Sequence, residues 1–264
     1  MTITSPHNEA LKEVRKLGGR RWRDKLREFV AEGEDLLEAA DAAGWEPRLR
    51  LAQQGSGLAG VEVAPGLLRD VSALGSGTRT LAVYPQRWAA ATSGPVCVAL
   101  WGVADPGNVG TVLRSALAFG ASSVAIGPGS ADPYAPKAVR ASMGALFSVP
   151  VARVREVGEL PGRKVALVAR EGRPIDAVAG PAAAHSGDRS AVHAGDPSVV
   201  ASGDSSAVPS GDLTLVIGAE REGLAVDVVA ACDEIAHIPI ASESLNAAMA
   251  ATVALYAVTR MAAR

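Results

Sequence analysis

Short runs of consecutive apolar residues recur through the second half of the chain, and each leads into a loop and then a segment with helical spacing. The apolar runs, which predict strands, cover residues 96–103, 122–127, 147–154, 164–170, 213–218 and 234–240. The segments predicted as helices cover residues 109–119, 135–143, 224–231 and 245–261. Because the runs do not alternate with polar residues, we expect strands covered on both faces, as in a mostly parallel, doubly wound α/β sheet.

A smaller α/β unit is predicted ahead of this region. Residues 36–44 combine apolar positions at helical spacing with a glycine stop. Strands are predicted at residues 49–52, 60–64 and 80–85, with a helix around 66–73. Residues 89–95 have the Ala, Thr, Ser, Gly and Pro composition of a linker. The chain is therefore expected to contain a domain of residues 1–88 and a domain of residues 96–264.

Residues 180–212 break this pattern, because they mix Ala, Ser, Gly, Pro and Val and contain no Phe, Trp or Tyr. Similar octapeptides follow one another from Arg189 to Asp212, so that aspartate recurs every eight residues. Aspartates beside glycines suggest calcium, but the glycine-rich nonapeptide spacing of calcium-binding solenoids is absent. Such a segment cannot bury enough apolar surface to order itself, and we expect a disordered surface insertion.

The composition favours a globular, cytoplasmic protein without a disulfide or a structural metal. Hydrophobic residues make up 48% of the chain, yet no apolar run approaches the roughly 20 residues of a membrane helix. The first residues turn charged almost at once and lack the apolar core of a secretory signal. Cys97 and Cys232 lie in apolar segments, and the four histidines form no ligand-spaced cluster with them, so we expect buried thiols and no zinc.

Basic residues are concentrated near the amino terminus, although the net charge of the whole chain is −2. Residues 12–27 hold eight basic and two acidic residues, a net charge of +6, together with Gly18-Gly19 and Trp22. A solvated helix face is one interpretation, but the interleaved tryptophan favours contact with an RNA backbone. The candidate RNA contacts are Arg20, Arg21, Arg23 and, in a later helical segment, Lys137 and Arg140. For the last two, exposed surface charge is the alternative.

Three stretches, residues 108–120, 215–224 and 238–256, each begin where a predicted strand ends. In open α/β folds the carboxyl ends of the strands form the ligand-binding edge of the sheet, so we expect these stretches to build one site. The loop before Asn108 is rich in glycine, but it lacks the G-x-G-x-x-G pattern and the later acidic residue of a dinucleotide site. A metabolite enzyme with a nucleotide cofactor is therefore disfavoured.

Several polar residues of these stretches also have structural interpretations. Helix N-caps are expected at Asn108, Ser244 and Asn246. Arg114 stands beside an apolar helix stripe and needs a partner, either a carboxylate or an anionic ligand such as phosphate. Gly218 permits close approach of the backbone, and Glu220 can accept hydrogen bonds from a ligand or a neighbouring loop.

Together these residues resemble the SpoU, or TrmH-like, branch of the SPOUT family of RNA 2′-O-ribose methyltransferases. The resemblance covers Val96 to Arg264 apart from the insertion and is carried by DPGNVGTVLRSALAFG, PGSADPYAPKAVRASMGALFSVPV and SLNAAMAATVALY. The basic segment followed by FVAEGEDLLEAA is similar to the family's ribosomal-protein-like RNA-binding domain. The resemblance implies an α/β domain with a trefoil knot, a homodimer, and S-adenosylmethionine as cofactor without a metal.

The resemblance also implies roles for individual positions. The positions that match the family's cofactor-binding residues are Gly218, Ile238 and Leu245. The positions that match its catalytic and RNA-handling residues are Asn108, Arg114, Glu220, Ser244 and Asn246. The chain departs from the family pattern in one loop, because only residues 240–243 separate the Ile-Pro pair from Ser244. The implied reaction is methyl transfer to a ribose 2′-hydroxyl of structured RNA, with ribosomal RNA favoured over transfer RNA; an RNA-binding protein without methyl transfer is the alternative.

Overall fold

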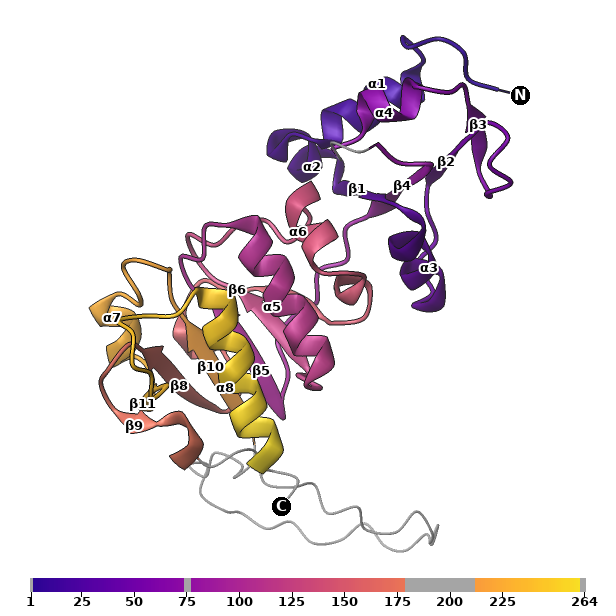
Figure 1. Cartoon of the computed structure of the whole chain (residues 1–264). Helices are drawn as coiled ribbons and strands as arrows, with labels where there is room; N and C mark the ends of the chain where they lie inside the picture. The colour runs from indigo at the N-terminus through magenta and orange to yellow at the C-terminus, as the bar shows by residue number, and fades with distance from the viewer. Residues whose placement is uncertain (1, 74–76, 179–211, 262–264) are drawn as a thin grey trace, which may run out of the picture.

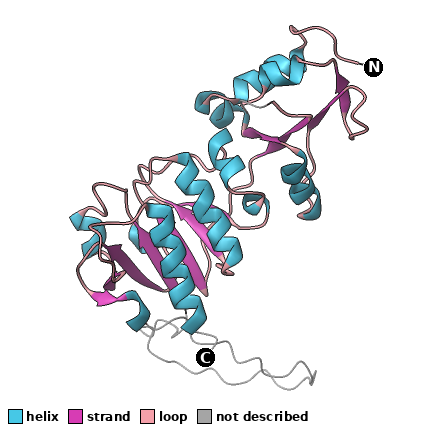
Figure 2. Cartoon of the chain, viewed as in Figure 1, coloured by secondary structure: helices cyan, strands magenta, loops and turns pink. Residues whose placement is uncertain are grey.

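The computed structural model describes residues 2–73, 77–178 and 212–261. The predicted insertion at residues 180–212 lies outside these ranges, apart from Asp212. Figure 1 shows two bodies that follow one another along the chain, and Figure 2 shows that each combines a sheet with helices. The chain is therefore α/β throughout its described length.

The first body is built on a four-stranded sheet with the order β1-β4-β2-β3. Its strands are β1 (Glu28–Glu32), β2 (Leu49–Gln53), β3 (Val61–Val63) and β4 (Thr80–Pro85). Its helices are α1 (Glu9–Leu17), α2 (Arg20–Leu26), α3 (Glu34–Ala42) and α4 (Leu67–Val71). Strand β4 is antiparallel to both β1 and β2, whereas β2 and β3 are parallel.

The basic segment folds as α1 and α2, with Gly18 and Gly19 between them. Arg27 ends α2 in the left-handed conformation, and the chain then enters β1, a strand that the sequence pattern does not predict. Gly33 makes the turn from β1 into α3 with a φ of 101°, a backbone conformation that residues with a side chain rarely adopt. The strand is hard to recognise from the sequence, because the apolar residues of β1 directly precede the helical spacing of α3.

The second body is built on a seven-stranded sheet with the order β7-β6-β5-β10-β8-β11-β9. Its strands are β5 (Val96–Leu100), β6 (Ser123–Ile126), β7 (Val151–Arg153), β8 (Arg163–Val168), β9 (Arg173–Pro174), β10 (Leu213–Ile217) and β11 (Glu234–His237). Every neighbouring pair in this sheet is parallel. All residues of β5, β6 and β10 are buried, which confirms the parallel sheet that the unbroken apolar runs predict.

The second body also contains helices. They are α5 (Pro106–Ala118), α6 (Pro136–Ala141), α7 (Val226–Ala230) and α8 (Ala247–Met261), with short 3₁₀ turns η1 (Ala145–Phe147), η2 (Val157–Glu159) and η3 (Ile175–Ala177). Figure 1 shows α5 and α8 side by side across one face of the sheet, and they are in contact. The strand predicted at residues 147–154 is shorter than expected: η1 ends at Phe147, and β7 covers only Val151–Arg153.

The two bodies share one apolar core. Phe29, on β1, packs against Tyr134 of the second body with ring centroids 4.8 Å apart. Trp45 packs edge-to-face against Phe147 with ring centroids 5.2 Å apart, and its indole N–H donates to the Phe147 carbonyl at 2.9 Å. Buried aromatic rings of this size are a major source of packing energy, so the two bodies are held as one unit.

The described residues contain neither a membrane-spanning helix nor a cluster of metal ligands, and their two cysteines are thiols. None of their helices combines the length and apolarity that crossing a membrane requires. Within the same ranges there is no group of three side chains able to hold a metal ion. Burial raises the pKa of the Cys97 thiol, and burial together with the Asp233 carboxylate raises the pKa of Cys232 to about 11. Both thiols are therefore protonated at neutral pH.

Candidate active site

A cavity of about 590 Å³ lies at the carboxyl ends of β8, β10 and β11. Its walls are formed by residues 167–169 at the end of β8, residues 217–224 from the last residue of β10 onward, and segments after β11. Five of the predicted site residues line it: Gly218, Glu220, Ile238, Ser244 and Leu245. Its volume is within the range of small-molecule and cofactor sites, about 300–1,000 Å³. The described chain thus places a ligand-sized cavity at the edge of the sheet that the sequence predicts.

Gly218 allows the loop after β10 to fold back tightly on itself. Ala219 and Gly223 exchange two backbone hydrogen bonds, at 3.1 and 3.0 Å, which close this loop. A Cβ atom on Gly218 would lie 2.3 Å from the carbonyl carbon of Gly223, which no real structure tolerates. The cavity wall therefore depends on a glycine at this position.

Three polar side chains from the three predicted stretches meet beside this cavity. The side-chain amide of Asn108, in the first turn of α5, donates to the Glu220 carboxylate. The side-chain amide of Asn246 donates to Asn108 Oδ1 at 3.2 Å. As the sequence predicts, residues that are more than a hundred positions apart form one hydrogen-bonded group at the sheet edge.

The helix caps differ from the prediction at two of three positions. Asn246 does cap α8, because its Oδ1 accepts from the backbone N–H groups of Ala248 and Met249 at 2.9 and 3.3 Å. Asn108 does not cap α5: Asp105 does, accepting from the Gly107 N–H at 2.5 Å. Ser244 lies exposed two residues ahead of the α8 cap and lines the cavity instead. Asn108 therefore uses its side chain in the polar group, and Ser244 presents its side chain at the cavity.

Asp105 was missed as a site residue, although its sequence context carries a signal. An aspartate followed directly by proline is a common start of a helix, since proline fits the first helical position. Lys137, from α6, donates to Asp105 Oδ2 at 2.8 Å and lowers the pKa of that carboxyl. The Gly107 N–H bond lowers the pKa further. The Asp105–Lys137 pair fixes the amino end of α5, which carries Asn108, a member of the polar group.

Arg114 lies apart from this group within one chain. It is exposed on α5, is not among the residues that line the cavity, and has no hydrogen bond or ion pair with any described residue. Of the two partners considered for Arg114, a carboxylate is therefore absent from the part of the chain that the structure describes, and the anionic ligand stays a prediction. Leu117, one turn further along, is exposed as well, as are Met249, Val253 and Tyr256 on the neighbouring α8.

The candidate RNA contacts divide into exposed and buried residues. Arg20 and Arg21 are exposed on α2, and Trp22 lies between two lysines, Lys16 and Lys25, whose ammonium groups stand 5.3 and 5.2 Å from the centre of its ring. This arrangement keeps positive charge together on the surface.

The prediction that Arg23 contacts RNA is wrong, because only 3% of this residue is exposed. Its guanidinium is bound to Asp132 at 2.8 Å and to backbone carbonyls of residues 17 and 18. A buried guanidinium whose donors are used internally cannot contact an RNA phosphate from the surface. The sequence pattern misled here, because the partner carboxylate stands 109 positions away.

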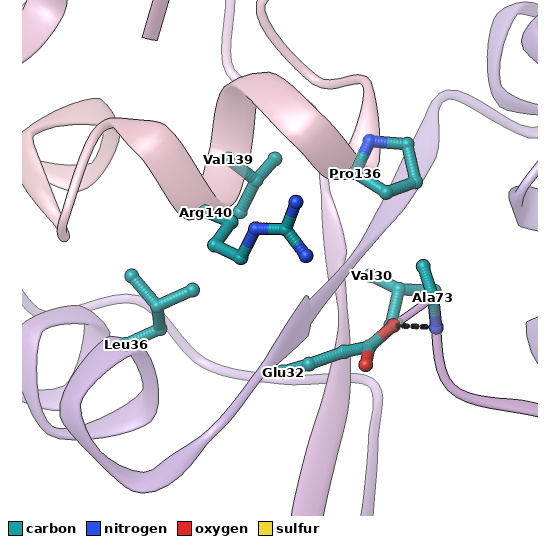
Figure 3. Close-up of a pocket in the computed structure, with 7 residues that line it drawn as sticks. All are labelled: Val30, Glu32, Leu36, Ala73, Pro136, Val139 and Arg140. Carbon is teal, nitrogen blue, oxygen red and sulfur yellow. Dashed lines mark hydrogen bonds between the residues drawn. The ribbon is translucent and has the colours of Figure 1, made fainter. Parts of the chain in front are cut away.

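Lys137 and Arg140 both lie on α6 but have different surroundings. Lys137 is half exposed and paired with Asp105, as described above. Arg140 lines a crevice between α6 and the smaller sheet, together with Val30 and Glu32 of β1. Figure 3 shows its guanidinium directed into this crevice, while Glu32 accepts a hydrogen bond from the Ala73 backbone at 2.8 Å.

Comparison with known proteins identifies the family. Residues 95–256 match the model of the SpoU rRNA Methylase family. The chain belongs to this family. The match begins beside β5 and includes all three stretches that meet at the cavity, so the polar group and the cavity lie within the region that matches the SpoU family.

Curated relatives match over part of their length. The 23S rRNA (uridine(2479)-2′-O)-methyltransferase of Streptomyces viridochromogenes is 36% identical over 158 residues, 59% of this chain and 49% of that protein. The 23S rRNA (guanosine(2553)-2′-O)-methyltransferase RlmP of Bacillus subtilis is 31% identical over 164 residues, 57% of this chain and 64% of that protein. The chain thus spans about half of the length of the first of these relatives.

Solved structures match over nearly the whole chain. An AdoMet-bound rRNA methyltransferase from Sinorhizobium meliloti has a TM-score of 0.78 at 25% identity, covering 98% of this chain and 97% of that one. The SpoU methyltransferase AviRb from Streptomyces viridochromogenes has a TM-score of 0.76 at 25% identity, covering 97% and 98%. The similarity extends through both bodies of the fold.

Proposed function

We propose that this chain transfers a methyl group from S-adenosylmethionine to a ribose 2′-hydroxyl of RNA. The observation that carries the proposal is the meeting of Asn108, Glu220 and Asn246 beside a cavity of about 590 Å³ at the carboxyl edge of a parallel sheet. The named activities of the similar proteins support the same reaction and favour ribosomal RNA. Such a substrate would place the protein in the cytoplasm.

The cavity suits S-adenosylmethionine, which supplies an electrophilic methyl group when bound. We propose that Gly218, Ile238 and Leu245 hold it, largely through backbone groups. The absence of a side chain at Gly218 is consistent with this role, because the chain there passes close to residues 223 and 224 and leaves its polar backbone next to the cavity. Ile238 and Leu245 are half-buried and supply apolar contact area. The proposed site needs no metal.

We propose that the polar residues act on the ribose. A 2′-hydroxyl is a weak nucleophile, so it must be aligned and must lose its proton as the new bond forms. Glu220, held by the Asn108 amide, presents a carboxylate that can accept a hydrogen bond from this hydroxyl. Ser244 lines the same cavity and can bond to the sugar. Arg114 keeps its proton in water, and we assign it a clamp on the neighbouring phosphate that also stabilises the developing alkoxide.

We propose a homodimer in which Arg114 acts at the site of the partner. In one chain Arg114 is exposed and away from the cavity, on the helix that also exposes Leu117. The neighbouring helix α8 exposes Met249, Val253 and Tyr256, with 58%, 40% and 44% of each residue accessible. Apolar residues grouped in this way are typical of a subunit interface. If a second copy packs on this face, Arg114 of one chain would lie at the polar group of the other chain.

The first body is proposed to bind the RNA, with residues 1–88 as its domain and residues 89–95 as a linker. Exposed Arg20 and Arg21, beside the lysine-flanked Trp22, are suited to phosphate contacts. Arg140 and Lys137 remain candidates at the boundary between the bodies. The trefoil knot of the carboxyl-terminal segment, which the family resemblance implies, and the ribosomal-protein-like character of the first body are part of this proposal.

The test measures transfer of tritium from labelled S-adenosylmethionine to deproteinised ribosomal RNA and, separately, to transfer RNA. We expect incorporation into ribosomal RNA at a ribose, located by mapping alkali-resistant positions. Glu220→Gln is the matched variant, since it keeps the shape of the side chain and loses the charge. Incorporation into transfer RNA alone would replace the substrate assignment. Binding of both S-adenosylmethionine and RNA without transfer to any RNA would favour a binding protein of the same fold.

A further inference from the structure

An ion pair between the two bodies is almost fully enclosed. Arg23, on α2, donates from Nε to Asp132 Oδ2 at 2.8 Å, and only 4% and 5% of the two side chains are exposed. The guanidinium also donates to the carbonyls of Leu17 and Gly18 at 3.0 and 2.8 Å. Asp132 uses its other oxygen to accept from the Tyr134 N–H at 2.9 Å. The pair is thus well supplied with hydrogen bonds, as a buried ion pair must be.

In the first body, the Arg23–Asp132 pair fixes the helix that carries the surface proposed to bind RNA. Arg23 belongs to the same short helix as exposed Arg20 and Arg21. Its bonds to the carbonyls of residues 17 and 18 also fix the end of α1 against α2. The Gln86 side chain adds a bond to the Arg23 carbonyl at 3.4 Å. The basic surface therefore cannot turn without moving Arg23.

On the other side, the pair ends on a loop that is bonded to the candidate active site. Residues 128–132 form hydrogen bonds with the loop after β5: Gly102 N–H to the Pro128 carbonyl at 2.9 Å, and Ala131 N–H to the Val103 carbonyl at 2.9 Å. Ser130 Oγ donates to the Leu100 carbonyl at 2.8 Å. The loop after β5 leads directly to Asp105 and the first turn of α5, where Asn108 lies.

We propose that Arg23 is a positioning residue, which sets the place of the RNA-binding helix α2 relative to the Asn108–Glu220–Asn246 group. This inference rests on the proposed function. The apolar contacts of the shared core are not directional, whereas the Arg23–Asp132 pair, like the Trp45 bond to the Phe147 carbonyl, has a defined geometry, and the pair is the one that acts directly on α2. RNA bound on α2 is then delivered with its ribose at a set distance from the cavity. Misplacement by about 1 Å can cost a factor of roughly a hundred in rate.

The experiment separates positioning from binding and from stability. Arg23→Met, Arg23→Lys and the wild type are compared in single-turnover transfer from S-adenosylmethionine to deproteinised ribosomal RNA, at saturating concentrations of both. Arg48→Met is the control, because Arg48 forms ion pairs with Glu13 and Glu28 inside the first body. For Arg23→Met we expect a rate at least about tenfold lower, with RNA and cofactor dissociation constants within about threefold of wild type. Arg23→Lys, which keeps the positive charge but loses the planar fork of the guanidinium, should lie between.

Rates are expressed per folded site, counted by titration with S-adenosylmethionine, so that partial unfolding does not imitate the effect. If Arg23→Met fails to fold, Arg23→Lys carries the comparison. An unchanged rate per folded site in these variants would overturn the proposal. A rise in the RNA dissociation constant with an unchanged rate would also overturn it, because Arg23 would then contribute to binding only.

A second measurement does not depend on activity. Spin labels are placed at the exposed positions Gln54→Cys in the first body and Asp176→Cys in the second, with Cys232→Ser; Cys97 is fully buried. The distance distribution between the labels should be wider in Arg23→Met than in wild type, and Arg48→Met should not change it. An equal width would contradict positioning even if wild type transfers methyl groups. A wider distribution without any wild-type transfer would instead reject the proposed function.

Discussion

The side-chain amide of Asn246 donates to Asn108 Oδ1 at 3.2 Å and so joins the start of the last helix to the first turn of α5. Asn246 has a second task, because its own oxygen caps α8 through two backbone N–H groups. One side chain therefore serves both helix stability and the arrangement of the candidate active site, and the two tasks use different atoms.

Substitution of Asn246 can separate these tasks. Asp at this position keeps the capping oxygen but replaces the amide donor with a second oxygen, which would face Asn108 Oδ1. We expect Asn246→Asp to keep the thermal stability of wild type and to lose most methyl transfer. Asn246→Ala should lose transfer and also about 1 kcal/mol of stability through the missing cap. Thermal unfolding and tritium transfer, measured on the same preparations, check both effects; full activity of Asn246→Asp would show that the amide link is dispensable.

The parts of this fold that could be predicted are those with local signals. Unbroken apolar runs specify the buried strands of the larger sheet, so the parallel sheet and the meeting of three loops at its edge follow from the sequence, whereas the apolar run of β1, next to the helical spacing of α3, is not recognised as a strand. The surroundings of Arg23 do not, because an arginine in a basic segment has no local sign of a carboxylate 109 positions away. The exposure of Arg114 is similar: its apolar neighbours indicate a partner, either a carboxylate or an anionic ligand, but they do not show that the helix turns the side chain outward.

Gly218 should be intolerant of any side chain. The Cβ of Gly218→Ala would lie 2.3 Å from the Gly223 carbonyl carbon and 2.5 Å from the Leu224 nitrogen, so the loop that walls the cavity must move. We expect calorimetry to show at least a tenfold loss of S-adenosylmethionine affinity. Gly158→Ala is the matched control, since a Cβ there meets nothing within 4 Å. Equal affinity in both variants would exclude the Gly218 loop from the cofactor site.

The Asp105–Lys137 pair makes stability depend on pH in a defined direction. The Lys137 bond lowers the pKa of the Asp105 carboxyl below its ordinary value, so the folded state favours the ionised form. The resulting stabilisation is present at pH values above the ordinary pKa and is lost as the pH falls through the lowered one. Lys137→Met should therefore lower the melting temperature at pH 7, and this difference should shrink toward about pH 3.

Thermal unfolding of wild type and Lys137→Met at a series of pH values provides the measurement. Because both side chains are about half exposed, salt should reduce the difference at pH 7. Arg140→Met, on the same helix and without an ion pair in the described chain, is the control. A difference that stays constant from pH 7 to about pH 3 would mean that Lys137 acts through packing and not through the Asp105 charge.

The proposed dimer makes a sharp prediction for Arg114. Arg114→Ala should abolish methyl transfer and leave S-adenosylmethionine binding nearly intact, since the cavity lining does not include this residue. Glu220→Gln should be inactive as well. If Arg114 acts at the site of the partner, a mixture of the two inactive variants forms heterodimers in which one of the two sites has both residues intact. Equal amounts, exchanged freely, should recover about a quarter of wild-type activity.

The same mixture distinguishes the alternatives. If Arg114 served the site of its own chain, neither site of the heterodimer would be complete and the mixture would stay inactive. The experiment requires subunit exchange, which size-exclusion chromatography of differently tagged copies verifies. Substitution of Tyr256 and Val253, exposed on α8, by lysine should prevent exchange and activity together if this face is the interface. A mixture that exchanges subunits yet remains inactive would reject the shared site, because Arg114 of one chain would then not act at the site of the other chain.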